Sequence, residues 1–233
     1  MEKMMRGWNG HTVDAANERR PAMIERIKCG MNNAYILSQG ENAILVDTAT
    51  AGYRRRILRA CEGKNIRLIV LTHGHYDHTQ NAAFLARELG AGIAMHPADM
   101  PLLRDMLAEP LESPVWTGKI LIGFMRLSKG RLTRNEPFEV AVELDDGFSF
   151  AEYGVEARVI ELPGHTRGSV GVVTADGLIA GDALTNLFPP AGKAALYSDE
   201  AAMEDSAAKA GALGDRMVWF GHGKPAKNRE WCA

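Results

Sequence analysis

The sequence of 233 residues predicts an α/β fold, with strands and helices in both halves of the chain. Short apolar runs bounded by glycine or acidic residues recur along the chain and are typical of strands. Longer segments between them place apolar residues at helical spacing. In each half, polar residues follow directly after a strand, which is the arrangement of an α/β fold with chemistry in its connections.

A single domain is expected over residues 1–233, because 46% hydrophobic and 24% charged residues suit one sizeable core. Residues 1–21 form a polar leader of mixed charge, without the apolar segment of a secretory signal. No run approaches the roughly 18 apolar residues of a membrane span. The three cysteines are odd in number and far apart, which fits a reducing compartment. We therefore expect a cytoplasmic protein.

The first half is expected to form a strand meander followed by an α/β unit. Residues 52–61 and 79–89 predict helices, the first with an exposed arginine-rich face and the second ending at Gly90. The segment 67–71 contains a continuous apolar run at 68–71, as in a strand that is buried on both faces. The strands expected in this half are 23–28, 33–38, 42–47, 67–71 and 92–95.

The second half is expected to consist mainly of strands joined by tight turns of acidic residues and glycine. Ser198 is the expected N-cap of a helix that has Asp199 and Glu200 in its first turn. The strands expected in this half are 140–144, 148–153, 157–162, 169–174, 178–180 and 217–220.

Residues 100–138 form a variable insertion between these halves, in which Pro110 and Pro114 interrupt an apolar sequence. Core packing or a dimer contact is the default interpretation. A second hypothesis makes this segment a flexible apolar lid over the functional cleft, with Trp116 and Phe124 contacting an apolar part of the substrate.

The net charge of −2 and the pI near 6.4 give no overall attraction to nucleic acid or acidic lipid. Any partner must therefore be recognised by a local site. We expect a small-molecule substrate, with neither nucleic acid nor a membrane as a partner, and leave a homodimer open.

Three of the seven histidines fall within six positions, in an H-x-H-x-D-H sequence formed by His73, His75, Asp77 and His78. Imidazole nitrogen and carboxylate oxygen are ligands of divalent transition metals. Because this segment follows the buried run at 67–71, its side chains are expected at the carboxyl end of a strand. The sequence therefore predicts a metal site.

Three further residues of ligand type also follow expected strands: His165, Asp182 and His222, each directly after a glycine. A neighbouring glycine allows close backbone approach, so that a polar side chain can be aimed from a strand end into a shared cleft. Five histidines and two aspartates exceed what one tetrahedral metal uses, but suit two metals that share a carboxylate. We expect two divalent ions, zinc first, with iron or manganese also compatible.

These motifs, in their order, resemble those of the metallo-β-lactamase-fold hydrolases over residues 35–224. The resemblance rests on H-x-H-x-D-H, on His165 in P-G-H-T, Asp182 in G-D and His222 in G-H-G, and on Asp47 in I-L-V-D-T. It implies a four-layer αβ/βα sandwich of two mixed β-sheets flanked by helices, with the metal cleft where the sheets meet. It also implies the ligand sets, which are His73, His75 and His165 for one metal, Asp77, His78 and His222 for the other, and Asp182 as a bridge.

The resemblance further implies a hydrolase whose nucleophile is a hydroxide between the two metals, since bound zinc lowers the pKa of water to about 7. Asp77 would orient this hydroxide or pass its proton to the leaving group. Asp47 is expected to hydrogen-bond to the ligand loops rather than to touch the metal. Lys224 is a candidate for binding a substrate carboxylate or phosphate, and a solvated lysine is equally compatible with its position.

The expected function is hydrolysis of an ester-, lactone- or thioester-like small molecule. Asp182 stands where a cysteine would indicate a secreted β-lactamase, so that class is disfavoured. Two alternatives remain. A mononuclear iron oxidoreductase similar to the persulfide dioxygenases would keep much the same motifs, and a non-catalytic regulatory module would hold its metal in a closed coordination sphere.

Overall fold

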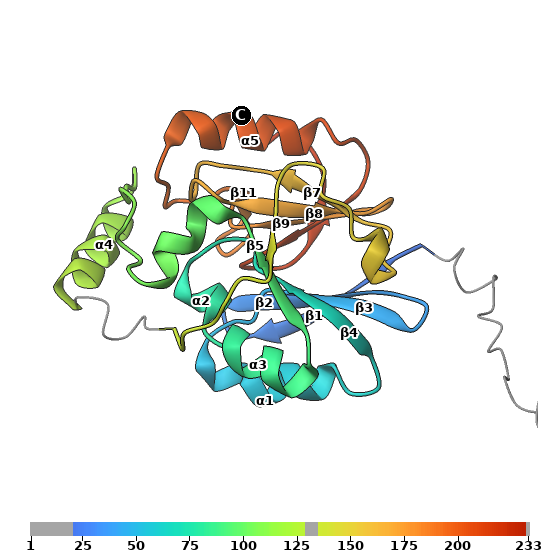
Figure 1. The fold of residues 1–233 in the computed structure, drawn as a ribbon. Coiled ribbons are helices and arrows are strands. Elements are labelled where there is room, and N and C mark those ends of the chain that lie inside the picture. The colour runs from blue at the N-terminus through green and yellow to red at the C-terminus, as the bar shows by residue number, and fades with distance from the viewer. Residues whose placement is uncertain (1–20, 129–134, 232–233) are drawn as a thin grey trace, which may run out of the picture.

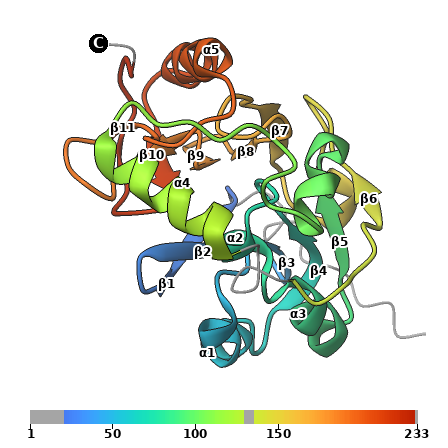
Figure 2. The same cartoon turned by 90° about the vertical axis from the view of Figure 1, so that its left-hand side faces the viewer.

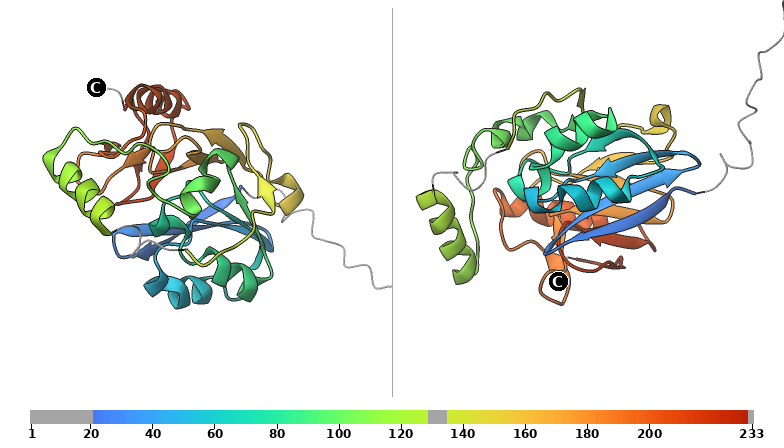
Figure 3. Two further views of the ribbon diagram at one scale, coloured as in Figure 1. Left: turned by 60° about the vertical axis from the view of Figure 1, so that its left-hand side comes forward. Right: turned by 90° about the horizontal axis from the view of Figure 1, so that it is seen from below.

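Two β-sheets lie face to face, with helices on the outer face of each (Figure 1). The computed structural model describes residues 21–128 and 135–231, apart from the side chains of Leu121, Phe124, Met125 and Ser128. Figure 3 shows the four layers, with α1 and α3 below the first sheet and α5 above the second. The expected αβ/βα sandwich is confirmed.

The first sheet has six strands in the order in which they occur in the chain. Its first three strands are antiparallel and the others join in parallel. The strands are β1 (Met23–Cys29), β2 (Asn32–Gln39), β3 (Asn42–Val46), β4 (Asn65–Val70), β5 (Gly92–Met95) and β6 (Val142–Glu143). The connections contain η1 (Ala51–Tyr53), α1 (Arg54–Ala60), α2 (Tyr76–Thr79) and α3 (Ala82–Leu89).

The second sheet has five strands in the order β13-β12-β9-β8-β7, and a separate hairpin pairs β10 with β11. The helix α5 (Glu200–Gly211) connects β11 to β12. The strands are β7 (Arg158–Glu161), β8 (Val170–Val173), β9 (Gly177–Gly181), β10 (Leu184–Thr185), β11 (Gly192–Lys193), β12 (Met217–Phe220) and β13 (Ala226–Lys227).

Alternation along the strands builds three apolar layers. In β2, Ala34 and Ile36 face the helices, whereas Tyr35 and Leu37 face the other sheet. Because successive side chains of a strand point to opposite faces, a strand of continuous apolar residues can serve two layers at once. The third layer lies between the second sheet and α5, where Ala207 and Ala210 are fully buried.

Residues 97–128 leave the first sheet after β5 and cross to the side of the sandwich. They contain η2 (Pro97–Leu103), an irregular segment, and α4 (Trp116–Ser128). Figure 2 shows α4 in front of the sandwich, on the side where α2 lies. The described part of the chain contains no helix long and apolar enough to cross a membrane.

Several expected elements differ from the structure. Residues 148–153 do not form a strand, because only Ser149 bridges to a neighbour and the chain turns in η3 (Ala151–Tyr153) before Gly154 at a φ of 75°. The helix expected at 79–89 begins at Ala82 as α3, and a separate short helix, α2, precedes it and ends at Thr79. The N-cap of α5 is Asp199, whose carboxylate accepts from the Ala202 N–H, and not Ser198.

Candidate metal centre

The turn between β4 and α2 carries His73 and His75, and α2 itself carries Asp77 and His78. The apolar residues of β4 are buried between the helix layer and the second sheet, which fixes where the strand ends. Asp77 occupies the first turn of α2, a position that favours a carboxylate near free backbone N–H groups. The four side chains are thereby presented at one edge of the sandwich.

The second sheet delivers the other three predicted residues. His165 follows β7, Asp182 follows β9 and His222 follows β12. Because β9 and β12 are parallel neighbours, Asp182 and His222 emerge side by side. Gly221 is required there, since a Cβ at this position would overlap Asp182 Oδ1 and His78 Cε1.

The structure brings all seven predicted ligands together. They form three overlapping groups whose ligand atoms lie within 4.8 Å of one another: His73, His75 and His165; His73, His78 and Asp182; and Asp77, His78 and His222.

Asp182 lies between the two outer groups. Its Oδ2 is 3.1 Å from His222 Nε2 and 3.7 Å from His165 Nε2, while its Oδ1 is 3.6 Å from His78 Nε2. A carboxylate with its two oxygens so placed is suited to bridging two cations.

These residues fit divalent metal ions. His73 Nε2, His78 Nε2 and Asp182 Oδ1 are buried without a hydrogen-bond partner. A buried polar atom left without a partner costs free energy, and a metal ion would remove that cost. In addition, His75 Nδ1 lies 3.0 Å from His165 Nε2, so two nitrogen ligands converge on one point.

Hydrogen bonds on the far side of three imidazoles leave Nε2 of each for the metal. His78 Nδ1 lies 2.8 Å from Asp47 Oδ2, and His165 Nδ1 lies 2.7 Å from the carbonyl oxygen of Leu196. His222 Nδ1 lies 3.1 Å from the carbonyl oxygen of Met31. An N–H donated in this way fixes the tautomer and orientation of a ligating histidine.

Asp47 connects the end of β3 to the ligand turn, as its position in the sequence predicts. It is fully buried, and its Oδ1 accepts the backbone N–H of Thr72 at 2.8 Å while Oδ2 faces His78. Asp47 has a φ of 59°, in the left-handed region that aspartate tolerates better than most residues. This backbone conformation is the strained kind that concentrates at functional sites.

The charges of the centre perturb its titration strongly. Burial opposes protonation of His222, but the carboxylates of Asp182 and Asp77 outweigh it and raise the pKa of the imidazole to about 11. His75 is buried beside His165, and its pKa falls to about 3. Burial raises the pKa of Asp182, but His222 and His78 outweigh this effect and hold it below its usual range.

Asp99 is a buried acid that no sequence motif singled out. Its Oδ2 accepts from the Gly74 N–H and the Thr166 hydroxyl, both at 2.7 Å, and its Oδ1 accepts from the Gly168 N–H at 2.6 Å. Burial raises the pKa of this carboxyl group, and these three donors oppose the increase. Asp99 therefore joins the turn of His73 and His75 to the turn of His165.

Asn32 is a second residue that sequence reasoning missed. Its Nδ2 donates to Asp77 Oδ2 at 2.8 Å. The neighbouring Asn33 donates to the carbonyl oxygens of Phe220 and Gly223, on either side of His222. Two consecutive asparagines at the start of a strand could have indicated a role beyond folding, because asparagine is uncommon in strands.

The remaining predictions fall outside the cluster. Lys224 is exposed, and its carbonyl oxygen accepts from Asn186. His96, which belongs to none of the predicted motifs, caps η2, with Nδ1 accepting from the Ala98 N–H, so it is not a ligand in this cluster. Trp116 is 72% exposed, so core packing is wrong for this side chain, and the Phe124 side chain lies outside the described residues.

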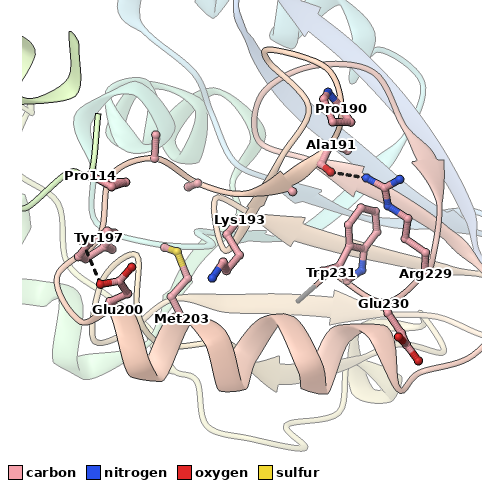
Figure 4. A pocket seen from close by; sticks show the side chains of 13 residues that line it. Pro114, Pro190, Ala191, Lys193, Tyr197, Glu200, Met203, Arg229, Glu230 and Trp231 are labelled. Carbon is pink, nitrogen blue, oxygen red and sulfur yellow. Dashed lines mark hydrogen bonds between the residues drawn. The ribbon is translucent and has the colours of Figure 1, made fainter. Parts of the chain in front are cut away.

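A cavity of about 580 Å³ lies between the β10–β11 hairpin, α5 and the C-terminal segment (Figure 4). In Figure 4 the Tyr197 hydroxyl bonds to Glu200, and the Arg229 guanidinium donates to the Ala191 carbonyl oxygen beside the Trp231 ring. Opposite charges and apolar walls are mixed in this cavity. None of the seven predicted ligands lines it.

Two facing sheets with a His/Asp cluster where their strands end define an α/β-sandwich protein that binds divalent metals. The chain belongs to the metallo-beta-lactamase superfamily, whose family model matches residues 27–222.

Among curated proteins, the chain is 37% identical over 149 residues to an uncharacterized protein of Mycobacterium tuberculosis. This alignment covers 59% of the chain and 58% of the relative. It is 29% identical over 163 residues to a hydroxyacylglutathione hydrolase of Anaeromyxobacter dehalogenans, covering 70% of this chain and 50% of that protein. The chain thus spans between half and three fifths of the length of these relatives. The solved structure of TTHA1623 in a di-iron-bound form matches with a TM-score of 0.64 at 24% identity, over 88% of this chain and 94% of that one, and shows the fold.

Proposed function

We propose that this protein is a binuclear metal-dependent hydrolase that cleaves ester-, lactone- or thioester-like bonds in small molecules. The observation that carries the proposal is the position of Asp182 between two groups of ligands, with one oxygen toward His78 and the other toward His165 and His222. A single tetrahedral ion would leave several of the seven ligands unused.

We assign the ligands as the resemblance to the superfamily implies, and two of the three groups of converging ligand atoms support this assignment. His73, His75 and His165 would hold one ion, Asp77, His78 and His222 would hold the other, and Asp182 would be shared. Two divalent cations, with zinc as the first candidate, supply Lewis-acid chemistry, since they polarise a substrate oxygen and lower the pKa of water.

Asp77 is the proposed acid and base of the reaction. Its side chain is 23% exposed, compared with 0% for His78 and 9% for Asp182, so it is the carboxylate of the cluster that substrate can reach. Asn32 donates to its Oδ2 and orients the group. A carboxylate held in this way can accept a proton from water and return it to the leaving group.

Buried side chains close the first ligand group on one side. Leu102, Met106 and Leu111, from the segment between β5 and α4, pack beside His75 and His165 and leave no room for a water molecule there. One relative is named hydroxyacylglutathione hydrolase, and because an acylated thiol is a thioester, this name supports including thioesters. Lys224, exposed after β12, remains a candidate contact for a substrate carboxylate or phosphate.

Metal analysis of untreated protein, followed by assays with lactones, thioesters, esters and phosphodiesters, tests the proposal. We expect two ions per chain and hydrolysis of one of the carbonyl classes. His75→Ala and Asp182→Ala should lose metal and activity together, whereas Asp145→Asn at an exposed turn should keep both. Normal metal content in both alanine variants would contradict the ligand assignment.

The same experiment separates the alternatives. One iron per chain, with oxygen consumption on a persulfide, would identify the mononuclear iron oxidoreductase instead. Two tightly bound ions without turnover of any of these substrates would identify a regulatory module.

A further inference from the structure

Helix α4 carries a row of apolar side chains that face solvent. Trp116 is 72% exposed, Ile120 61% and Leu127 81%. Positions 116, 120, 123 and 127 are four, three and four residues apart, so they lie on one face of the helix. The third of these positions is Gly123, which is also exposed.

The opposite face of α4 is the one that packs on the protein. Ile122 is 5% exposed, and a Cβ on Gly118 would overlap Ser113 and lie 3.4 Å from Leu196. The exposed row is therefore separate from the face through which α4 packs on the rest of the protein. Large apolar side chains gathered on an outer helix face mark an interaction site.

The charged residues of α4 are all of one sign. The helix contains two cationic residues and no acidic one, whereas the whole chain has a net charge of −2. Within α4 the two cations are Lys119 and Arg126, both exposed and seven residues apart, so they flank the apolar row on one side.

We propose that α4 docks on an anionic lipid surface, with Trp116, Ile120 and Leu127 entering the interface and Lys119 and Arg126 contacting the headgroups. A basic helix with tryptophan and aliphatic residues on one face has the composition of a helix that lies in the plane of a membrane surface. Charge complementarity favours this occupant, because each cation near an anionic surface adds attraction.

A second copy of this chain fits the row less well. A symmetric contact through α4 would bring Lys119 and Arg126 of both copies together, with no acidic residue in the helix to compensate. Nucleic acid would use the cations but would leave the apolar row exposed. A lipid surface as partner differs from the expectation, drawn from overall charge, that a membrane is no partner, and the vesicle experiment below distinguishes the two.

The docked orientation would bring the metal centre to the lipid. Figures 1 and 2 show α4 on the side of the sandwich where α2 lies, and α2 carries Asp77 and His78. Docking of α4 does not depend on the proposed hydrolase activity, since lipid binding is measured without turnover.

Sedimentation with vesicles tests the docking of α4, using phosphatidylcholine alone and phosphatidylcholine mixed with phosphatidylserine. We expect the protein to sediment with the mixed vesicles, to bind the neutral ones at least about fivefold more weakly, and to be released by salt. Ile120→Asp and Leu127→Asp should each abolish sedimentation, and Arg126→Glu should weaken it by about fivefold or more.

Met23→Asp is the matched control, because Met23 is 69% exposed on β1, outside α4. It should bind as the unchanged protein does, and metal content and circular dichroism should be equal in all variants. Equal binding to both vesicle types, or undiminished binding by Ile120→Asp, would overturn the inference. So would a dimer in sedimentation velocity that Ile120→Asp dissociates, which would make a second copy the occupant.

Discussion

The carboxylate of Asp99 accepts the backbone N–H of Gly74 at 2.7 Å, in the interval between His73 and His75. Its other oxygen accepts from Gly168, close to His165. A residue outside the ligand motifs therefore holds two ligand turns at a fixed separation. Ligand geometry that must be accurate to a fraction of an ångström depends on such supporting bonds.

Asp99→Asn should weaken the centre without removing a ligand. Both oxygens of Asp99 accept from backbone N–H groups, and an amide can offer an oxygen to only one of them. We expect a loss of about 1–3 kcal/mol in the free energy of unfolding, because a buried donor loses its partner. Urea unfolding measures the loss, and metal retained during dialysis against a chelator should fall. Asp105→Asn, exposed in the same segment, is the control and should change neither quantity.

Asp47→Asn should lower metal affinity by about 10–100-fold, the usual effect of removing a group that orients a ligand. One carboxylate oxygen faces His78 Nδ1 and the other accepts from Thr72, so the amide cannot satisfy both. Competition with a chromogenic chelator gives the dissociation constant. An unchanged constant would show that Asp47 does not orient His78.

Gly221→Ala should abolish metal binding, although it removes no polar group. The added methyl group would occupy space now held by Asp182 Oδ1 and His78 Cε1. Gly52→Ala is the matched control, since a Cβ there would meet nothing within 4 Å. Metal analysis of the two purified variants tests this prediction. Full metal occupancy in Gly221→Ala would contradict it and would show that the end of the strand can shift.

Cys29 and Cys61 should resist modification in the native protein. Both are buried and free, and burial raises the pKa of each thiol to about 11. A thiol titration at neutral pH should find at most one reactive cysteine, Cys232, which lies outside the described residues, and three after denaturation.

These thiols also make stability depend on alkaline pH. The folded pKa of about 11 is above the ordinary thiol value of 9.0, so the folded protein binds the protons more tightly than the unfolded chain. This contribution is complete below pH 9 and is lost as the pH rises toward 11. Urea midpoints should fall over this range, and Cys61→Ser should reduce the dependence.

The sequence predicted the parts of this fold that depend on local patterns. Apolar runs marked β2, β3, β4 and β12 because those strands serve two buried layers or one clearly alternating face. The two-residue strands β10, β11 and β13, which were not expected, are too short to leave a pattern. The sequence did not predict helix α4, because the helix is apolar on two faces, one packed and one exposed, and so lacks a simple helical spacing of apolar residues.

The site was predictable where chemistry required particular side chains. All seven predicted ligands converge, since so many histidines and aspartates placed directly after strands are rarely needed for folding alone. Asp99 and Asn32 could not be selected, because their importance lies in contacts with residues distant in sequence. A single buried acid has no sequence pattern of its own.

Side chains of β2 make one of the contacts that join the two sheets. The Tyr35 hydroxyl and the Asn33 amide both donate to the carbonyl oxygen of Phe220, two residues before His222. A slip of one sheet over the other would break these bonds and carry His222 and Asp182 away from Asp77 and His78. Metal affinity should therefore depend on how the two sheets are aligned. A bound ion would in turn stabilise that alignment, because its ligands come from both sheets.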